Sequence, residues 1–215
     1  MKDFYKKYIN NEVGFDKLTH LGILSLIIVI SGVFGWVYEF IFYYFNSGMK
    51  EFYFRGGNFL PWINIYAIGA LLVYFLTKKM KKTKKNALKF FIISVVATGI
   101  LEYVGGYLMY TLGNGFRCWD YNSEILNFGN INGFVCLRSV LFFGVSCLML
   151  IYLIVPMCYY IASKMNKKSF LIMSFSICGL FLLDEIYNLV IARILNLPRA
   201  SDIYKSIGFK YVSFK

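Results

Sequence analysis

Long apolar stretches alternate with short polar links along this chain. The stretches cover residues 21–45, 62–77, 90–112, 137–161 and 170–195. Most of them approach the roughly 20 residues that an α-helix needs to cross about 30 Å of hydrocarbon. The pattern predicts an all-α fold, a polytopic transmembrane helix bundle with about five spanning helices. The bundle is expected over residues 21–195, after a cytoplasmic N-terminal segment (1–20) and before a C-terminal tail (196–215).

The composition agrees with a multi-pass protein of the cell membrane whose main partner is the lipid bilayer. Of the 215 residues, 59% are hydrophobic and 16% are charged, whereas soluble domains average about 45–50% and about 25%. The net charge of +12 does not indicate nucleic-acid binding, because most lysines lie in the short links and no nucleic-acid-binding motif occurs.

The positions of the lysines predict the orientation. One link carries Lys78, Lys79, Lys81, Lys82, Lys84, Lys85 and Lys89, and the link before the last stretch carries Lys164, Lys167 and Lys168. The positive-inside rule places both links, and with them the N-terminus, in the cytoplasm. The tail residues agree less well, because five spans place the tail outside, and it carries Arg199, Lys205, Lys210 and Lys215.

Four carboxylates within the apolar stretches, Glu39, Glu102, Asp184 and Glu185, are the first candidates for a functional site. Ionisable residues are costly in hydrocarbon and mark function by default. Along their helices, Glu39, Glu102 and Asp184 lie roughly 27, 18 and 21 Å from the cytoplasmic ends. All three therefore fall in the non-cytoplasmic half. The alternative is that they are hydrogen-bonded contacts between helices.

Cations and aromatic residues are expected at the same end. Arg55 and Arg117 lie in the two outer links, and Arg138 begins the fourth stretch. Arginine pairs well with carboxylates because its planar fork binds two oxygens. We therefore expect a substrate-binding site or buried charge cluster that faces the non-cytoplasmic side. Its predicted members are Glu39, Arg55, Tyr66, Glu102, Arg117, Trp119, Asp120, Tyr121, Asn127, Arg138 and Asp184.

Three segments carry a resemblance to a known family. They are residues 54–71 (FRGGNFLPWINIYAIGAL), 101–144 (with RCWDY at 117–121 and VCLR at 135–138) and 180–189 (LFLLDEIYNL). In these segments the chain resembles the bacterial family of putative ABC-transporter type IV permeases. The match implies a membrane permease and assigns family positions to Glu39, Arg55, Gly56, Pro61, Tyr66, Gly69, Glu102, Arg117, Trp119, Asp120, Tyr121, Asn127, Cys136, Leu137 and Asp184. The chain departs from the family pattern at Asn64, Ala67 and Asn132-Gly133.

Three functions fit these observations. The first is a permease-like or transport-associated membrane protein, acting as a homodimer or as a partner subunit of a transport system. The second is a structural or regulatory membrane subunit with buried charge pairs. The third is a membrane-embedded enzyme that acts on a lipid or headgroup through carboxylates.

Enzymatic chemistry has little support in the sequence. There is no Gly-x-x-x-x-Gly-Lys-Ser/Thr phosphate loop and no recognised catalytic set, and neither a metal site nor a cofactor is expected. The five cysteines form no Cys-x-x-Cys pair. Cys118 and Cys136 lie in or beside one outer link, where a disulfide is conceivable, but free thiols are the favoured expectation.

Overall fold

The computed structural model describes residues 2–211, and over that range the fold is all-α, with no β-strand. Four helices are long and apolar enough to cross a membrane: Lys17–Asn46, Lys84–Leu112, Leu137–Lys164 and Lys167–Ile194. The helix Asn64–Thr77 is also apolar but shorter. The all-α prediction and the multi-pass prediction are thus confirmed, with four helices as candidate spans.

The chain forms two compact units. The first comprises residues 2–12 and 72–153, and the second comprises residues 13–71 and 154–211. Two continuous helical stretches pass from one unit to the other, namely α3 (Asn64–Thr77) and the stretch Leu137–Lys164.

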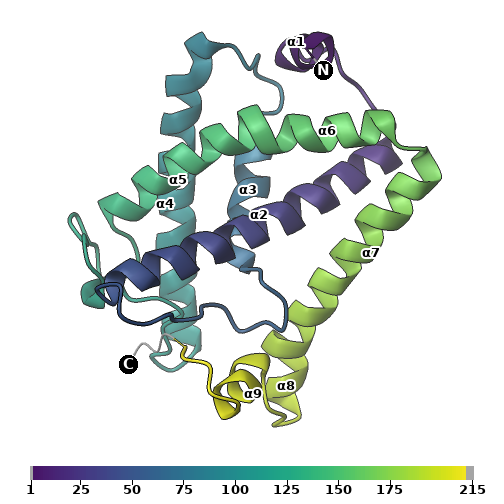
Figure 1. Ribbon diagram of the computed structural model, residues 1–215. Coiled ribbons are helices and arrows are strands. Elements are labelled where there is room, and N and C mark those ends of the chain that lie inside the picture. Colours follow the sequence, from purple (N-terminus) through teal and green to yellow (C-terminus); the bar gives the residue numbers. More distant parts are fainter. Residues whose placement is uncertain (1, 212–215) are drawn as a thin grey trace. The chain divides into compact units, whose positions relative to one another are not determined.

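The first unit is built on two helices that pack against each other, α4 (Ala87–Leu112) and α5 (Leu137–Met149), and Figure 1 shows α5 crossing α4 at an oblique angle. Small residues let them approach closely, as is common between membrane helices. A Cβ at Gly99 would meet Val140 at 3.1 Å. The hydroxyl of Ser94 donates to the carbonyl of Phe143 at 3.0 Å across the same interface.

The short helix α1 (Lys2–Ile9) is attached to this unit by two tyrosines. The hydroxyl of Tyr8 donates to the carbonyl of Ile151 at 2.7 Å, and that of Tyr5 donates to the carbonyl of Tyr152 at 3.1 Å. Both carbonyls belong to the π-helical segment Leu150–Ile154, just before Pro156. Because proline has no N–H, it cannot bond the carbonyl four or five residues earlier. Hydroxyls of α1 therefore donate to both carbonyls that an N–H at position 156 could have reached, Tyr152 in an α-helical turn or Ile151 in a π-helical turn.

The second unit is built on α2 (Lys17–Asn46) and α7 (Lys167–Ile186), which run parallel (Figure 1). Their first residues lie at the same end, because Lys167 pairs with Asp16, the N-cap of α2, at 3.1 Å. Further along, a Cβ at Gly32 would meet the ring of Phe181 at 3.2 Å. The helix α6 (Val155–Lys164) packs against the same pair.

The link 47–63 and the tail after α7 meet at the opposite end of this unit. The tail contains a π-helical segment (Tyr187–Ile191), α8 (Ala192–Ile194) and α9 (Ala200–Ser206). The amide of Phe54 donates to the carbonyl of Lys210 at 2.8 Å, and Tyr204 donates to the carbonyl of Phe59 at 2.8 Å. The ammonium of Lys210 bonds Glu51 and holds the pKa of that carboxyl below its usual range.

Candidate functional site

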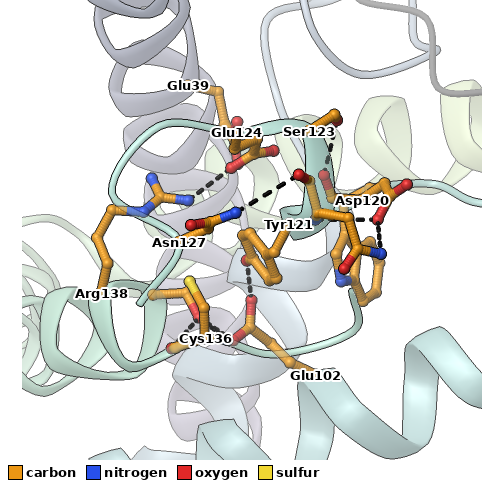
Figure 2. Close-up of polar contacts among 12 residues, drawn as sticks. Glu39, Glu102, Asp120, Tyr121, Ser123, Glu124, Asn127, Cys136 and Arg138 are labelled. Atoms are coloured by element: carbon orange, nitrogen blue, oxygen red, sulfur yellow. Dashed lines mark hydrogen bonds and ion pairs between the residues drawn. The ribbon is translucent and has the colours of Figure 1, made fainter. Parts of the chain in front are cut away.

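Glu102 lies on α4 and is 4% exposed. It accepts hydrogen bonds from two hydroxyls, that of Tyr121 at one carboxylate oxygen and that of Ser139 at the other, the latter at 2.8 Å. Ser139 stands in the first turn of α5, directly across the helix interface, and Tyr121 comes from the link between α4 and α5. Figure 2 shows the Tyr121 side chain directed at Glu102. The carboxylate thus joins two helices and a loop.

Arg138 and Glu124 form an ion pair on the other side of Tyr121. A guanidinium nitrogen lies 2.5 Å from a carboxylate oxygen of Glu124, and both side chains are largely buried (Figure 2). The Arg138 guanidinium also lies over the Tyr121 ring, 5.4 Å from its centroid, as in a cation–π contact. We call Glu102, Tyr121, Glu124, Arg138 and Ser139 the Glu102 cluster.

The link 113–136 is folded by its own polar residues. Trp119 donates its indole N–H to the carbonyl of Phe134 at 2.8 Å, and Arg117 donates to the carbonyl of Asn132 at 3.0 Å. Asp120 accepts from the backbone and side-chain amides of Asn122 (Figure 2). The backbone of Gly133 has φ +75°, which favours glycine. These bonds hold Tyr121 in place above α4.

A second cluster forms around Glu39 in the other unit. The hydroxyl of Tyr66 donates to Glu39 at 2.7 Å, and the Nε atom of Arg55 lies 3.5 Å from the second carboxylate oxygen. The Arg55 guanidinium also covers the ring of Tyr43, 5.2 Å from its centroid. Gly35, one turn before Glu39, leaves room for the Tyr66 ring, which a Cβ would strike.

Asp184 and Glu185 on α7 hold the link 47–63 in the same unit. Asp184 accepts from the backbone amides of Phe59 and Leu60, both at 2.9 Å, and Glu185 accepts from the side chains of Asn58 and Asn64 at 2.7 and 3.1 Å. These contacts fasten one loop to the last long helix.

The tail is fastened through Asn188. Its side-chain nitrogen donates to Asp184 at 2.8 Å, and its side-chain oxygen accepts from the amide of Ala200, the first residue of α9, at 2.8 Å. One side chain therefore connects the acid on α7 with the tail helix. We call Glu39, Arg55 and Tyr66 the Glu39 cluster, and Asp184, Glu185 and Asn188 the Asp184 cluster.

One protein family matches most of the chain. The family described as Putative ABC-transporter type IV covers residues 26–189. The chain belongs to this family. No curated protein and no solved structure matches the chain. The part shared with the putative ABC-transporter type IV family includes Glu39, Glu102 and Asp184, whereas α9 lies beyond it.

The residues expected at the site divide between the two units of this family member. The first unit contains Glu102, Arg117, Trp119, Asp120, Tyr121, Asn127 and Arg138, and the second contains Glu39, Arg55, Tyr66 and Asp184. Arg55 lies beside Glu39. Arg138 instead binds Glu124, Arg117 lies 3.5 Å from Asp120, and Asp184 is bound by amides.

Several partners of the acids were not identified from the sequence. They are Ser139, Asn58 and Asn64, together with the bond that Asn188 accepts from the amide of Ala200. Glu124, the acid that pairs with Arg138, was not identified either. Only Asn188 carried a signal, because it follows Asp184 by four residues and so shares its helix face. Asparagine and serine are common in links and helix starts, and nothing in the sequence distinguishes the ones that bind carboxylates.

Metal-binding groups and disulfides are absent from the described part of the chain. Residues 2–211 contain no group of three His, Cys, Asp or Glu side chains that could hold a metal ion. Cys118 and Cys136 are not joined by a disulfide. What the clusters can do chemically is bind cations or hydrogen-bond donors at their carboxylates.

Proposed function

We propose that this protein is a permease-like, transport-associated membrane protein whose polar clusters serve a solute at the non-cytoplasmic side. The observation that carries the proposal is Glu102, a buried carboxylate in an apolar helix with a tyrosine and a serine hydroxyl bound to it. A buried acid in a membrane helix is costly and marks an ion or substrate pathway by default. Membership of the putative ABC-transporter type IV family supports the same class.

The proposal includes five spans, with α3 as the second. Its 14 residues would cover about 21 Å as an α-helix, so this span needs a locally thinner bilayer or help from the residues before it. Five spans put the link 47–63 and the tail on one side. Their direct contacts through Phe54 and Lys210 support that arrangement.

The orientation is part of the proposal. The Asp16–Lys167 pair lies at the end where α2 and α7 begin, and the lysine-rich links favour the cytoplasm for this end. The Glu39 and Asp184 side chains lie toward the other ends of these helices. For a chain with five spans and no internal repeat, we propose that a second copy or a partner subunit completes the transport unit.

A structural role is the second candidate, and one observation favours it. Each buried acid connects a helix to a loop or to another helix: Glu102 reaches Tyr121 and Ser139, and Asp184 reaches Phe59 and Leu60. Such contacts would be needed to hold the links in place even without a solute. The transport role and the structural role predict different effects when a buried acid loses its charge but keeps its shape.

The test compares the small molecules inside and outside cells that express or lack this protein, using mass spectrometry. Transport predicts at least one solute whose distribution changes when the wild-type protein is present. A control variant keeps the clusters but alters an exposed residue, such as Lys50→Gln, and should behave as the wild type. A distribution that is the same for every solute with and without the protein would reject transport in favour of the structural candidate.

A further inference from the structure

We propose that α1 and the link 78–89 together form a binding surface for anionic phospholipid headgroups, independent of the solute sites proposed above. The surface belongs wholly to the first unit. Figure 1 shows α1 near the link that joins α3 to α4. We call this region the basic face.

The helix α1 is fastened to the link 78–89 as well as to the π-helical segment Leu150–Ile154. The amide of Lys82 donates to the carbonyl of Ile9 at 3.0 Å, and Asn11 donates to the carbonyl of Lys79 at 3.2 Å. The ammonium of Lys82 bonds Asn11 and lies over the ring of Tyr8, 5.5 Å from its centroid. The helix is therefore a fixed part of this unit.

The docking of α1 against the link determines how charge is distributed over the basic face. Tyr8 is buried and Tyr5 is half-buried on the inner side of α1, whereas Lys2, Lys6 and Lys7 are exposed. The exposed lysines of the basic face are Lys2, Lys6, Lys7, Lys79, Lys81, Lys84, Lys85 and Lys89. In residues 2–12 and 78–89 the only acids are Asp3 and Glu12. The face is thus strongly positive.

Exposed apolar side chains lie beside the lysines of the basic face. Phe75 and Leu76 near the end of α3 are 47% and 50% exposed, and Leu88 at the start of α4 is 69% exposed. These side chains lie next to the lysines in the chain and suit contact with acyl chains, while ammonium groups suit phosphates. Apolar residues beside clustered lysines favour a lipid surface over a purely acidic protein partner. Each lysine near an anionic surface contributes about 1 kcal/mol.

The experiment is native mass spectrometry of the purified full-length protein over a series of lipid concentrations. The probes are phosphatidylglycerol, which is anionic, and phosphatidylcholine, which carries no net charge. Phosphatidylglycerol should bind more tightly. Lys6→Gln/Lys7→Gln and Lys81→Gln/Lys84→Gln should each weaken its binding by about tenfold or more. The matched control, Lys50→Gln/Lys205→Gln, removes the same charge from exposed lysines of the other unit and should leave binding unchanged.

A second variant tests whether docked α1 is needed. Tyr8→Phe keeps every lysine but removes the bond to Ile151, and it should weaken phosphatidylglycerol binding without changing the charge. Equal binding of the two lipids, or unchanged phosphatidylglycerol binding in both lysine pairs, would overturn the proposal. It would also be overturned if an acidic peptide, but no lipid, bound in a lysine-dependent way, because the face would then serve a protein partner. None of these outcomes depends on solute transport.

Discussion

Buried carboxylates in this protein are bound by different kinds of donor, and the kind of donor sets what each can do. Glu102 is bound by hydroxyls, Glu39 by a hydroxyl and a guanidinium, and Asp184 by backbone amides. Amides of a loop cannot leave without unfolding that loop, so Asp184 is suited to a fixed role. A tyrosine hydroxyl can turn away, so Glu102 and Glu39 are better placed to exchange partners.

A substitution at Gly35 tests how closely the side chains of the Glu39 cluster are packed. A Cβ at this position would strike the ring of Tyr66, which donates to Glu39. Gly35→Ala should therefore lower the thermal stability, at a cost of about 1–3 kcal/mol for overpacking. The control is Gly179→Ala on α7, where a Cβ meets nothing within 4 Å and no loss is expected. Equal effects of the two substitutions on the unfolding temperature would contradict this packing.

The buried ammonium of Lys82 should make the stability of the folded state depend on pH. Burial lowers its pKa to about 8, below the ordinary lysine value of about 10.4. The folded state therefore loses this proton before the unfolded state does, and this lysine makes the folded state more stable as pH rises from about 8 to about 10.4. The free energy of unfolding should be measured for the wild type and for Lys82→Met over that pH range. It should rise with pH in the wild type relative to the variant. A difference independent of pH would show that Lys82 is not buried by α1.

At the scale of elements, the stretch Leu137–Lys164 shows how a membrane helix accommodates proline. Pro156 follows a π-helical segment, and hydroxyls from α1 donate to the carbonyls four and five residues before it, one of which loses its donor to the proline. In hydrocarbon such freed carbonyls need another donor. The short N-terminal helix thus has a structural reason to dock where it does.

The coupling between α1 and Pro156 can be measured with a double-mutant cycle. Tyr8→Phe leaves the carbonyl of Ile151 without its hydroxyl and should cost about 1–3 kcal/mol of stability. Pro156→Ala restores an N–H, so in that background Tyr8→Phe should cost less. Tyr107→Phe, an exposed tyrosine on α4, is the control and should have little effect. Additive costs for the two substitutions would mean that the tyrosine and the proline act independently.

The long helices could be predicted because a membrane helix needs only length and hydropathy. The helix Lys167–Ile186 begins before its apolar stretch at residue 170, since Asn166 caps it at a polar position. The short helices α1 and α9 and the π-helical segments were not predicted, because they depend on contacts distant in sequence. The acids could be identified from their apolar surroundings, but Ser139 and Asn58 could not, because a serine or asparagine has no distinguishing pattern.

At the scale of the whole molecule, the proposed topology can be tested by cysteine labelling. In a background without the five native cysteines, a reagent that cannot cross the membrane should label Ser123→Cys from outside. It should not label Lys81→Cys until the membrane is opened. Both positions are exposed, so access to solvent does not limit the reaction. Labelling of position 81 from outside would reverse the orientation and place Glu102 toward the other side.

We propose that Glu102 serves a solute rather than only the fold, and the variant Glu102→Gln separates these two roles. Glutamine keeps the shape and can still accept a hydrogen bond, but it removes the charge. The decisive measurement is the solute distribution in cells containing this variant at the same membrane abundance as the wild type, with the unfolding temperature measured in parallel. If Glu102 serves a solute, the variant should be a folded protein that no longer changes the distribution of that solute. A variant that is less stable, but whose surviving protein changes that distribution as the wild type does, would contradict it.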